Sequence, residues 1–431
     1  MNNYTNNSSD NNSNNYNNYN NYNNYNNYNN YNNYNNYNNY NNYNNILYIC
    51  HSYSSFQKDS IEAMSKYFEN LSVLVRYNPL VEMLKYFPIP YLEPFKLHHK
   101  LDLTKKPPNL DLFLTPVLYA PLDSQYKKIG KSHHQAAEKV ILKNNIKFDL
   151  IHSHFSWSAG YVGAKLKEKY SVPFIVTVHG YDIYELPFRD KEWMKNIKYV
   201  LNSADCIITV SNSNYECIKK LNVKTPVKIL PNGFRCAVFY PQNSDECRKT
   251  LGLPPGVKII LTVGALMDVK GHKYLIEAIG EVVKGRKDVL CIIVGGGNLK
   301  NKLQKQINSE GIQNHVKLVG PKNHNEIPIW MNSCDIFVLP SLKEGNPTVL
   351  FECLGCGIPF VGTKVGGIPE IIVSDDYGMI SEPGDSKDLA KKIELALEKK
   401  WCSKDIRTYG ERFVWENITK EIYDIYNNLL L

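Results

Sequence analysis

Two carboxylates, Glu344 and Glu352, stand at the ends of a short segment that follows the apolar run 335–340. A short run that is rich in β-branched and aromatic residues and ends in proline predicts a buried strand. Glu344 would then lie in the loop at the carboxyl edge of a sheet, where open α/β sheets bind ligands. Glu352 would lie inside the helix that follows, and its reach would be limited to that helix's surroundings.

Asn346 and Pro347 predict where this helix begins. Asn346 suits the capping position, and Pro347 suits the first turn. A free helix N-terminus attracts phosphate, while carboxylates on both sides of it can bind hydroxyl groups. The segment 344–352 therefore suits a sugar nucleotide, which carries hydroxyls at both ends and phosphate between them. The alternative is a pair of solvated glutamates.

Three more loops follow apolar runs of the same kind. One begins at Gly264 and leads to Lys270, beside the start of a helix, where a lysine suits a diphosphate. A solvated surface lysine is the alternative. The other two, 295–297 and 366–367, are glycine-rich and would allow a ligand to approach the backbone closely. Each loop alone is weak evidence, and the loop 295–297 also lacks the spacing of a dinucleotide fingerprint.

Histidines mark the strand ends of the preceding half of the chain. His152 and His154, two positions apart, could begin a metal site, but the sequence offers no evident third ligand. Hydrogen-bonded structural histidines are the alternative. His179, followed by Gly180 and Asp182, stands directly at a strand end and is the best placed of these side chains to face a ligand.

The length of 431 residues predicts two or three domains, and the formal net charge is +8. This modest excess fits an anionic ligand or an anionic membrane surface and is too dispersed to indicate nucleic acid. No stretch approaches the roughly 18–20 apolar residues that a spanning helix needs. The ten cysteines show no regular framework, so we expect reduced cysteines in a cytosolic protein. Cys353 and Cys356 have the spacing of half a metal site or a redox pair, but packing is the preferred interpretation.

The first 45 residues form a tail in which tyrosine recurs every third position from Tyr16 to Tyr43, separated by asparagines. Such a tract has too little apolar area to offset its ordering entropy, and we expect it to be disordered. A stacked Asn/Tyr assembly is the alternative.

After the tail, strands and helices alternate, which predicts parallel sheets with helices on both faces. The pattern runs once through 46–240 and restarts through 241–405, so we expect two doubly wound domains that enclose a ligand cleft. The last segment, 406–431, is expected to form a helix that crosses back to the first domain. The proline-rich stretch 78–125 is hard to assign. It could serve the acceptor site or dock on a membrane, or it could pack as an insertion on its own domain.

The motifs together resemble the signature of retaining glycosyltransferases of family 4, in particular microbial envelope and exopolysaccharide enzymes. Single pieces are weak, but their order and spacing are specific. The resembling segments are 177–182, 210–211, 231–233, 263–264 with 270–271, 335–341, 344 with 352, 355–359 and 366–370.

The resemblance implies an α/β protein of the GT-B class, with two Rossmann-like domains facing a cleft. The acceptor would bind to the N-terminal domain and the donor mainly to the C-terminal domain. It implies that Glu352 binds the ribose and Glu344 the donor sugar, that Lys270 neutralises the diphosphate, and that His179 lies near the reacting carbon. The implied catalytic residues are His179 and Glu344, the acceptor side holds His154 and Asp182, and the donor-binding set is Gly264, Lys270, Gly296, Gly345, Asn346, Pro347, Thr348 and Glu352.

By this resemblance the protein transfers a sugar from a UDP- or GDP-sugar to a glycan or lipid-linked acceptor, without a cofactor or metal. We expect a cytoplasmic protein that touches the inner face of the membrane only peripherally. A sugar-nucleotide epimerase and a non-catalytic binding protein are the alternatives. Two departures from the family pattern stand out: Ala265 occupies a position where an arginine is common, and the loop 51–56 lacks the usual pair of glycines.

Overall fold

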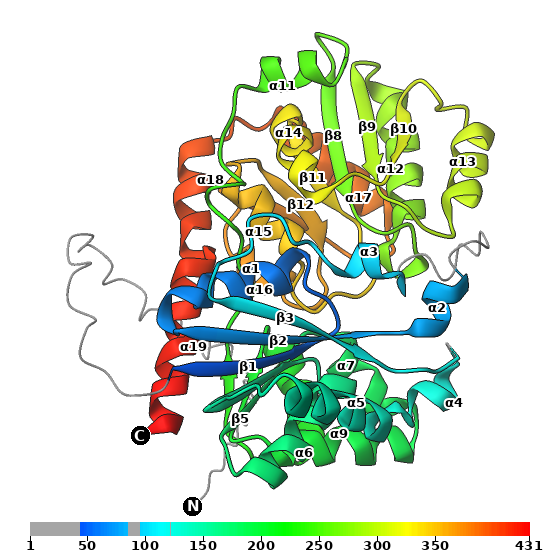
Figure 1. The fold of residues 1–431 in the computed structure, drawn as a ribbon. Helices are drawn as coiled ribbons and strands as arrows, with labels where there is room; N and C mark the ends of the chain where they lie inside the picture. Colours follow the sequence, from blue (N-terminus) through cyan, green and yellow to red (C-terminus); the bar gives the residue numbers. More distant parts are fainter. Residues whose placement is uncertain (1–43, 85–94, 121) are drawn as a thin grey trace, which may run out of the picture. The chain divides into compact units, whose positions relative to one another are not determined.

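The computed structural model describes residues 44–84, 95–120 and 122–431 (Figure 1). Tyr43–Leu431 form one compact unit. The predicted disordered tail lies outside the described residues, apart from Asn44 and Asn45. Asn45 is the first residue of strand β1 and is paired with Asn70, so the folded chain begins one residue earlier than predicted.

The first sheet has seven strands in the order β3-β2-β1-β4-β5-β6-β7, and all pairs are parallel. Successive residues of β1 alternate between two buried clusters, because side chains of a strand point to opposite faces. Both faces of the sheet are therefore covered. The strands are β1 Asn45–Cys50, β2 Asn70–Tyr77, β3 Leu110–Pro116, β4 Leu150–His154, β5 Phe174–Val178, β6 Cys206–Thr209 and β7 Val227–Ile229.

Ten α-helices accompany the first sheet in the described part of the chain. A short π-helical turn, Ser156–Gly160, separates β4 from α6. The helices are α1 Ser55–Met64, α2 Pro79–Met83, α3 Leu97–Lys100, α4 Asp123–Tyr126, α5 Ile129–Lys143, α6 Tyr161–Tyr170, α7 Tyr181–Tyr184, α8 Leu186–Arg189, α9 Lys191–Ser203 and α10 Asn212–Lys220.

The second sheet has six parallel strands in the order β10-β9-β8-β11-β12-β13. Residues of β9 alternate between two further buried clusters. The strands are β8 Lys258–Val263, β9 Val289–Val294, β10 Val316–Gly320, β11 Ile336–Leu339, β12 Phe360–Thr363 and β13 Gly378–Ser381. The helices are α11 Ser244–Thr250, α12 His272–Gly285, α13 Lys300–Ser309, α14 Ile327–Ser333, α15 Thr348–Gly355, α16 Ile368–Ile371, α17 Ser386–Glu398, α18 Ser403–Gly410 and α19 Trp415–Leu430.

Each sheet contains one point where the strand order reverses. In the first sheet this point lies between β1 and β4, and in the second it lies between β8 and β11. Doubly wound sheets bind ligands outside the carboxyl ends of the strands at such a point. The loops after β8 and β11, which carry Lys270 and Glu344, therefore flank the expected ligand position of the second sheet.

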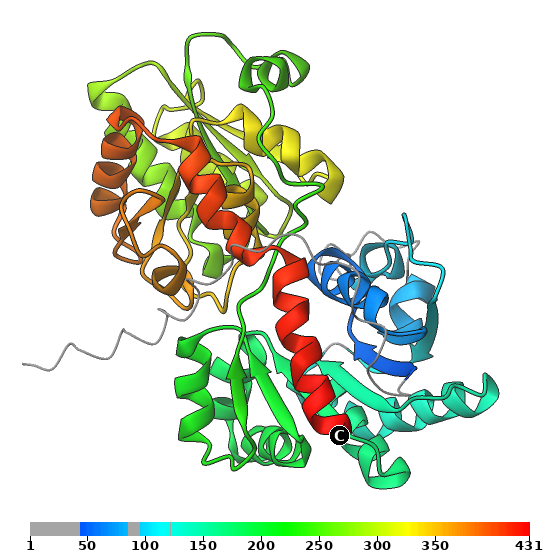
Figure 2. The same ribbon diagram turned by 90° about the vertical axis from the view of Figure 1, so that its left-hand side faces the viewer.

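The C-terminal segment serves both sheets. Helix α18 packs with the second sheet's cluster through Ile406 and Tyr409, and α19 packs in a cluster of the first sheet. Figure 2 shows the two helices in red, one after the other. Buried Tyr426 of α19 lies with its hydroxyl 3.0 Å from that of Tyr48 on β1. The last helix is thus part of the core of the first sheet.

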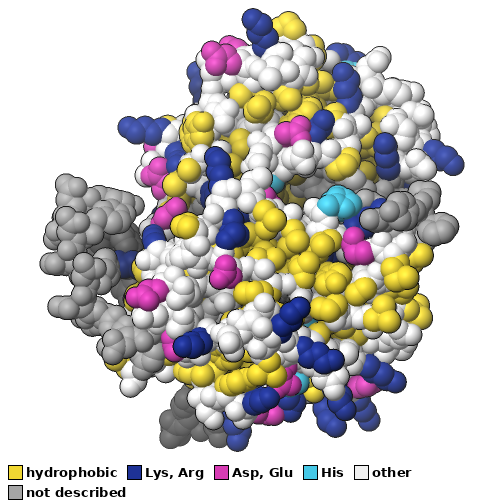
Figure 3. All heavy atoms as spheres, viewed as in Figure 1, with side chains coloured by type: hydrophobic (Ala, Val, Ile, Leu, Met, Phe, Trp, Pro, Cys, Tyr) yellow, Lys and Arg dark blue, Asp and Glu magenta, His cyan; other side chains and the backbone are white. Residues whose placement is uncertain are grey.

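The segment 78–125, which the sequence left unassigned, contains an edge strand, β3, paired along its length with β2. Leu110, Leu112 and Leu114 pack into or against a buried cluster of the first sheet. Four large apolar side chains of the same segment remain more than half exposed: Met83, Leu103, Leu118 and Leu122. Figure 3 shows hydrophobic side chains gathered on the face viewed in Figure 1. The packed-insertion interpretation holds for β3, while the exposed side chains keep an apolar surface available.

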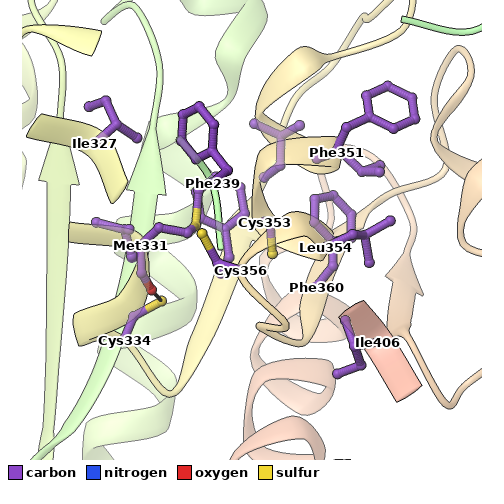
Figure 4. Close-up of a cluster of buried hydrophobic side chains, with 14 of the residues drawn as sticks. Phe239, Ile327, Met331, Cys334, Phe351, Cys353, Leu354, Cys356, Phe360 and Ile406 are labelled. Atoms are coloured by element: carbon purple, nitrogen blue, oxygen red, sulfur yellow. Dashed lines mark hydrogen bonds between the residues drawn. The ribbon is translucent and has the colours of Figure 1, made fainter. Parts of the chain in front are cut away.

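Cys353 and Cys356 are packing residues, as preferred from the sequence. Both are fully or nearly fully buried in a cluster that includes Met331, Cys334 and Phe360 (Figure 4). Burial raises the pKa of both thiols well above the usual range. All ten cysteines are free thiols. Within the described ranges no cluster of three or more histidine, cysteine or acidic side chains could hold a metal ion. Across those same residues, no helix is long and apolar enough to span a bilayer.

Candidate active site

Lys270 and Glu344 form an ion pair at the reversal point of the second sheet. Lys270 follows β8 in a short 3-10 turn, and its Nζ lies 2.6 Å from Oε1 of Glu344 in the loop after β11. Ser341 also donates a hydrogen bond of 2.7 Å to this oxygen. The Lys270 side chain is 27% exposed and that of Glu344 only 8%. The pair therefore presents a cation to the surface above a carboxylate that is held in place.

The two loops are fitted closely to each other. Leu342 donates a backbone hydrogen bond of 2.8 Å to Val269, which joins the loop after β11 to the turn after β8. Gly271, with φ of 66°, starts α12, and a Cβ there would lie 1.9 Å from the carbonyl oxygen of Pro340. Only glycine permits both this backbone conformation and this approach. The local sequence thus fixes Lys270 beside the Glu344 loop.

Gly264 and Gly296 line the same edge with backbone. A Cβ at Gly264 would meet nothing closer than 4.0 Å, and the Lys270 side chain is among its nearest neighbours. Leu266 donates a 2.8 Å hydrogen bond to the carbonyl of Gly296. Ala265 lies between Gly264 and Leu266 in the sequence, and its methyl group adds no charge. Gly264 therefore lies next to Lys270, which carries the cationic charge at this position, and Gly296 lies in the adjacent loop.

The predicted Asn346 cap is wrong. Helix α15 begins at Thr348, with Pro347 in the capping position and no side-chain cap. The Asn346 side chain instead accepts a 2.8 Å hydrogen bond from the backbone of Asn232, whose side chain donates one of 2.7 Å to the Asn346 carbonyl. A contact between residues 114 positions apart has thus replaced the local one. The helix N-terminus at Thr348 is left without a side-chain partner.

Glu352 lies on α15 with a histidine beside it. Nε2 of His324, from the loop after β10, lies 2.9 Å from Glu352 Oε1. Burial opposes the charge on His324, but the hydrogen bond and the negative charge of Glu352 outweigh it and raise the His324 pKa above its usual value. Sequence reasoning missed His324, because its loop carries no motif. Glu352 lies within the helix that follows the Glu344 loop, as predicted.

The three histidines of the first sheet form a buried stack. His152 and His154 are almost fully buried, and the rings of His154 and His179 stack with centroids 5.2 Å apart. His154 Nδ1 lies 3.0 Å from His179 Nε2, and burial lowers the pKa of both imidazoles. His152 contacts the hydroxyls of Thr177 and Tyr426. His152 is therefore a hydrogen-bonded structural histidine, and His179 is a neutral, partly exposed side chain.

Asp182 organises the loop that carries His179. Its carboxylate accepts hydrogen bonds from the backbone N–H groups of Ser156, His179 and Gly180, at 2.8, 3.1 and 3.0 Å. The side chain is buried, which raises its pKa, while these hydrogen bonds act in the opposite direction. Asp182 was predicted on the acceptor side, and in the structure its carboxylate holds the backbone of the His179 loop in place.

The His179 loop lies against the Glu344 loop. A Cβ added to Gly345 would lie 2.0 Å from the carbonyl oxygen of His179. Nearby, the Glu370 carboxylate accepts hydrogen bonds from the backbone of Asn212 and Ser213, at 2.8 and 3.0 Å. Two segments that belong to the second sheet thus contact the carboxyl edge of the first. His179 and Glu344, 165 positions apart along the chain, are brought to one place.

A cavity of about 560 Å³ opens at the carboxyl edge of the first sheet, near the histidine stack. The ring of His51 lines it and stacks on Phe155, which in turn contacts His179. Its volume falls in the range of about 300–1,000 Å³ that small-molecule sites occupy. Sequence reasoning missed this cavity, although Arg76, a charge at the end of an apolar strand, was a usable signal. The lining residues are His51, Ser52, Arg76, Phe95, His99, Lys100, Tyr119, Leu122, Asp123, Tyr126, Tyr181 and Arg189.

Two doubly wound parallel sheets, with a cation and a carboxylate at the reversal point of the second sheet and a histidine at a strand end of the first, are the architecture of GT-B glycosyltransferases. The chain matches the family description "Glycosyl transferases group 1" over residues 243–413 and "Glycosyltransferase Family 4" over residues 105–238. An uncharacterized glycosyltransferase of Methanocaldococcus jannaschii is 30% identical over 288 residues, which cover 65% of this chain and 76% of the relative. The chain belongs to the family 4 glycosyltransferases, as its motifs predicted.

Two further relatives carry more specific names. TuaC of Bacillus subtilis, named for teichuronic acid biosynthesis, is 30% identical over 60% of this chain and 64% of its own length. A D-inositol 3-phosphate glycosyltransferase of Corynebacterium jeikeium is 26% identical over 67% of this chain and 74% of its own.

Solved structures confirm the fold. A sucrose-phosphate synthase from Thermosynechococcus elongatus matches with a TM-score of 0.74 at 20% identity, covering 90% of this chain and 99% of that one. HepE of Anabaena, in a complex with UDP-glucose, matches with a TM-score of 0.68 at 21% identity, covering 89% of this chain and 100% of that one.

Proposed function

We propose that this glycosyltransferase transfers a sugar from a UDP- or GDP-sugar to a glycan or lipid-linked acceptor, with retention of configuration and without a metal ion. The observation that carries the proposal is the Lys270–Glu344 pair, 2.6 Å apart, beside the His179 loop. A cation and a hydroxyl-binding carboxylate so close together suit the diphosphate and the sugar of one donor. HepE is described with UDP-glucose, which supports the nucleotide-sugar class.

Negative charge develops on the departing diphosphate during transfer, and positioned donors that stabilise it lower the barrier. Lys270 provides a point charge, and the uncapped N-terminus of α15 at Thr348 provides free backbone N–H groups. Gly345 lets the loop lie against His179 without a side chain in between. These groups supply the electrostatic stabilisation that a metal supplies in other transferases.

Glu344 acts as a positioning group for the donor sugar. Its Oε1 is already shared between Lys270 and Ser341, which fixes the carboxylate but leaves Oε2 to accept hydroxyl hydrogen bonds. The anomeric C–O bond to phosphate breaks, the bond to the acceptor oxygen forms on the same face, and the departing phosphate oxygen takes the acceptor proton. Burial lowers the pKa of His179, so its imidazole is neutral. A neutral imidazole can hydrogen-bond the sugar near this carbon.

Glu352 is assigned to the ribose. It lies inside α15, its side chain is 10% exposed, and His324 holds one of its oxygens. A carboxylate can accept two hydrogen bonds from a pair of vicinal hydroxyls, the chemistry that ribose recognition requires. On binding, the ribose hydroxyls would compete with His324 or use the remaining oxygen.

A place in cell-envelope or polysaccharide synthesis is supported by the name of TuaC. The apolar side chains Leu118 and Leu122, 69% and 59% exposed, support a peripheral membrane contact near a lipid-linked acceptor. Sedimentation with liposomes that contain anionic lipid tests this contact. Absence of sedimentation would remove it from the proposal without affecting the chemistry.

A donor screen tests the proposed reaction. The protein is incubated with UDP- and GDP-sugars in the presence of a chelator, and donor hydrolysis and thermal shift are measured. At least one donor should give slow hydrolysis or a higher melting temperature. If no donor does so with the chelator but one does with a divalent metal, the metal-independent part of the proposal is wrong. Product analysis without acceptor separates transfer from epimerisation, and a protein that binds donors without turnover would be non-catalytic.

A further inference from the structure

The cavity beside His51 contains two cations that no carboxylate neutralises. Arg76, at the end of β2, is 4% exposed, and Lys100, at the end of α3, is 8% exposed. Within the described part of the chain neither side chain forms an ion pair. Asp123, the acidic residue of the lining, is instead paired with Arg189 at 2.7 Å. The cavity thus holds two basic side chains that form no ion pair with a described carboxylate.

The two cations are fixed by neutral contacts. Arg76 donates through Nη1 to the Ser158 hydroxyl at 2.8 Å, and its guanidinium lies over the rings of Tyr119 and Tyr126. Its Nε is buried and has no hydrogen-bond partner among the residues that the structure describes. Lys100 donates to the carbonyl of Arg76 at 3.1 Å. A buried arginine with an unused donor is costly unless a ligand satisfies it.

The positive charges of Arg76 and Lys100 contribute to the pKa shifts of neighbouring groups. Burial and the charge of Arg76 lower the Lys100 pKa to about 7. Burial, followed by Arg76 and Lys100, also holds the pKa of His51 and of His133 well below the usual value. Glu82 offsets part of this at longer range. An anion in the cavity would relieve the repulsion among these groups.

We propose that this cavity binds the phosphate group of a phosphorylated acceptor, with Arg76 and Lys100 as its ligands. The inference rests on the proposed transfer reaction and names the acceptor class. A phosphate monoester carries a charge of about −1.5 to −2 at neutral pH, which matches two cations better than one carboxylate does. The cavity's volume also accommodates the sugar or polyol that bears the phosphate. His51 and Phe155 link the cavity to His179, so the acceptor would extend toward the transferring sugar.

Calorimetric titration tests the proposal with glucose 6-phosphate and, as a probe without the charge, glucose. Excess UDP occupies the proposed donor phosphate site, so that glucose 6-phosphate cannot bind there. If UDP does not bind, the titration is done instead with the Lys270→Gln variant, which lacks the cation of that site. Glucose 6-phosphate should bind the wild type and glucose should not. Lys100→Gln should weaken binding about tenfold or more, the loss expected for one charge-assisted hydrogen bond.

Lys131→Gln is the matched control, because Lys131 is exposed on α5 of the same sheet and lies outside the cavity. It should leave glucose 6-phosphate binding unchanged. Arg76→Lys keeps the charge, so it should retain part of the affinity and remain folded. The UDP-induced thermal shift of Lys100→Gln should equal that of the wild type. A shift that is missing in the wild type with both UDP and GDP would contradict the proposed donor, while the phosphate result would still stand.

A second arm distinguishes a free from a lipid-borne phosphate. Vesicles of phosphatidylcholine with and without phosphatidic acid are sedimented with wild type, Lys100→Gln and Lys131→Gln. Binding that requires phosphatidic acid and Lys100, together with no binding of glucose 6-phosphate, would assign the cavity to a lipid phosphate. Binding of neither probe, or binding that is equal in Lys100→Gln and the wild type, would overturn the proposal.

Discussion

Nζ of Lys270 lies 2.6 Å from Oε1 of Glu344, although the two residues are 74 positions apart. The cation proposed for the diphosphate is therefore already neutralised when no donor is bound. A donor must share or replace this carboxylate. Removing the charge of Lys270 and removing that of Glu344 should therefore have opposite effects on UDP binding.

Removing the carboxylate charge by Glu344→Gln should free Lys270, so UDP should bind as well as or better than to the wild type while transfer slows. Lys270→Gln should instead weaken UDP binding about 10- to 100-fold, because a charge-assisted hydrogen bond contributes about 1.5–3 kcal/mol. Isothermal titration with UDP measures both. Lys343→Gln, an exposed neighbour in the same loop, is the control. Weaker UDP binding in both variants would contradict the competition.

The proposed division of labour between the two glutamates is tested by their alanine variants. Glu352→Ala should weaken nucleotide binding and so raise KM, because it removes the hydroxyl acceptor of the ribose. Glu344→Ala should mainly lower kcat, because the sugar is misplaced in the transition state. Steady-state kinetics with the active donor separates the two effects. Equal changes in KM and kcat for both variants would show that the assignment is wrong.

His324 gives a pH-dependent contribution to stability. Its folded-state pKa is raised above the usual 6.5 by Glu352, which outweighs burial. The folded state thus binds the proton more tightly than the unfolded state, so this stabilisation is complete below pH 6.5. It is lost as the pH rises through the raised pKa. Denaturant unfolding of wild type and His324→Gln should differ most at about pH 6 and least at about pH 9.

A difference that grows with pH would contradict this sign. His315→Gln is a suitable control, because His315 hydrogen-bonds a backbone carbonyl of the second sheet and contacts no carboxylate in the described structure. Its difference from the wild type should not follow the same pH profile.

The contact between the His179 loop and the Glu344 loop, both proposed to act in catalysis, predicts a steric effect at Gly345. A Cβ there would lie 2.0 Å from the carbonyl oxygen of His179. Gly345→Ala must therefore displace the loop from His179, and a shift of about 1 Å in a positioned group can slow a reaction about 100-fold. The fold should persist, since the residues of this loop belong to none of the buried hydrophobic clusters of the two sheets. Activity together with the melting temperature checks this.

Gly252→Ala provides the comparison, because a Cβ at Gly252 would meet no atom within 4 Å. Its φ of 63° adds a backbone strain that Gly345, which has no positive φ, lacks, so Gly252→Ala is a demanding control for the contact. Transfer by Gly252→Ala should remain near the wild-type rate. Normal activity of Gly345→Ala would show that the approach of the two loops is not required.

Much of the fold and the position of the site could be predicted from the sequence, because both depend on local patterns. Apolar runs ending at glycine or proline located β8, β9 and β11, and the loops after β8 and β11 placed Lys270 and Glu344 at sheet edges. Strand β3 was missed, since it lies at the sheet edge among prolines and is mostly half-exposed. The Asn346 cap failed because Asn232 takes its place through a contact 114 residues away. Local preference cannot reveal such pairings, and the Arg76–Lys100 cavity depends on several of them.

Lys100 gives the sharpest test of whether the cavity is kept for a ligand. Its folded pKa of about 7 lies far below the usual 10.5 because of burial and Arg76. Between these two pH values the unfolded state binds more protons than the folded state, so stability rises with pH across this window. Each pKa unit corresponds to about 1.4 kcal/mol, and Lys100→Met should therefore raise the free energy of unfolding by about 2–4 kcal/mol below pH 7. The gain should shrink as the pH approaches 10.5.

The same variant should lose binding of glucose 6-phosphate. A protein that becomes more stable while it loses a ligand shows that the cation is retained for function at a cost in stability. Denaturant unfolding at several pH values, with Lys131→Met as the exposed control, measures the gain. If Lys100→Met destabilises the protein at neutral pH, the lysine supports the fold through its hydrogen bond to Arg76, and its charge is not the strained element inferred here.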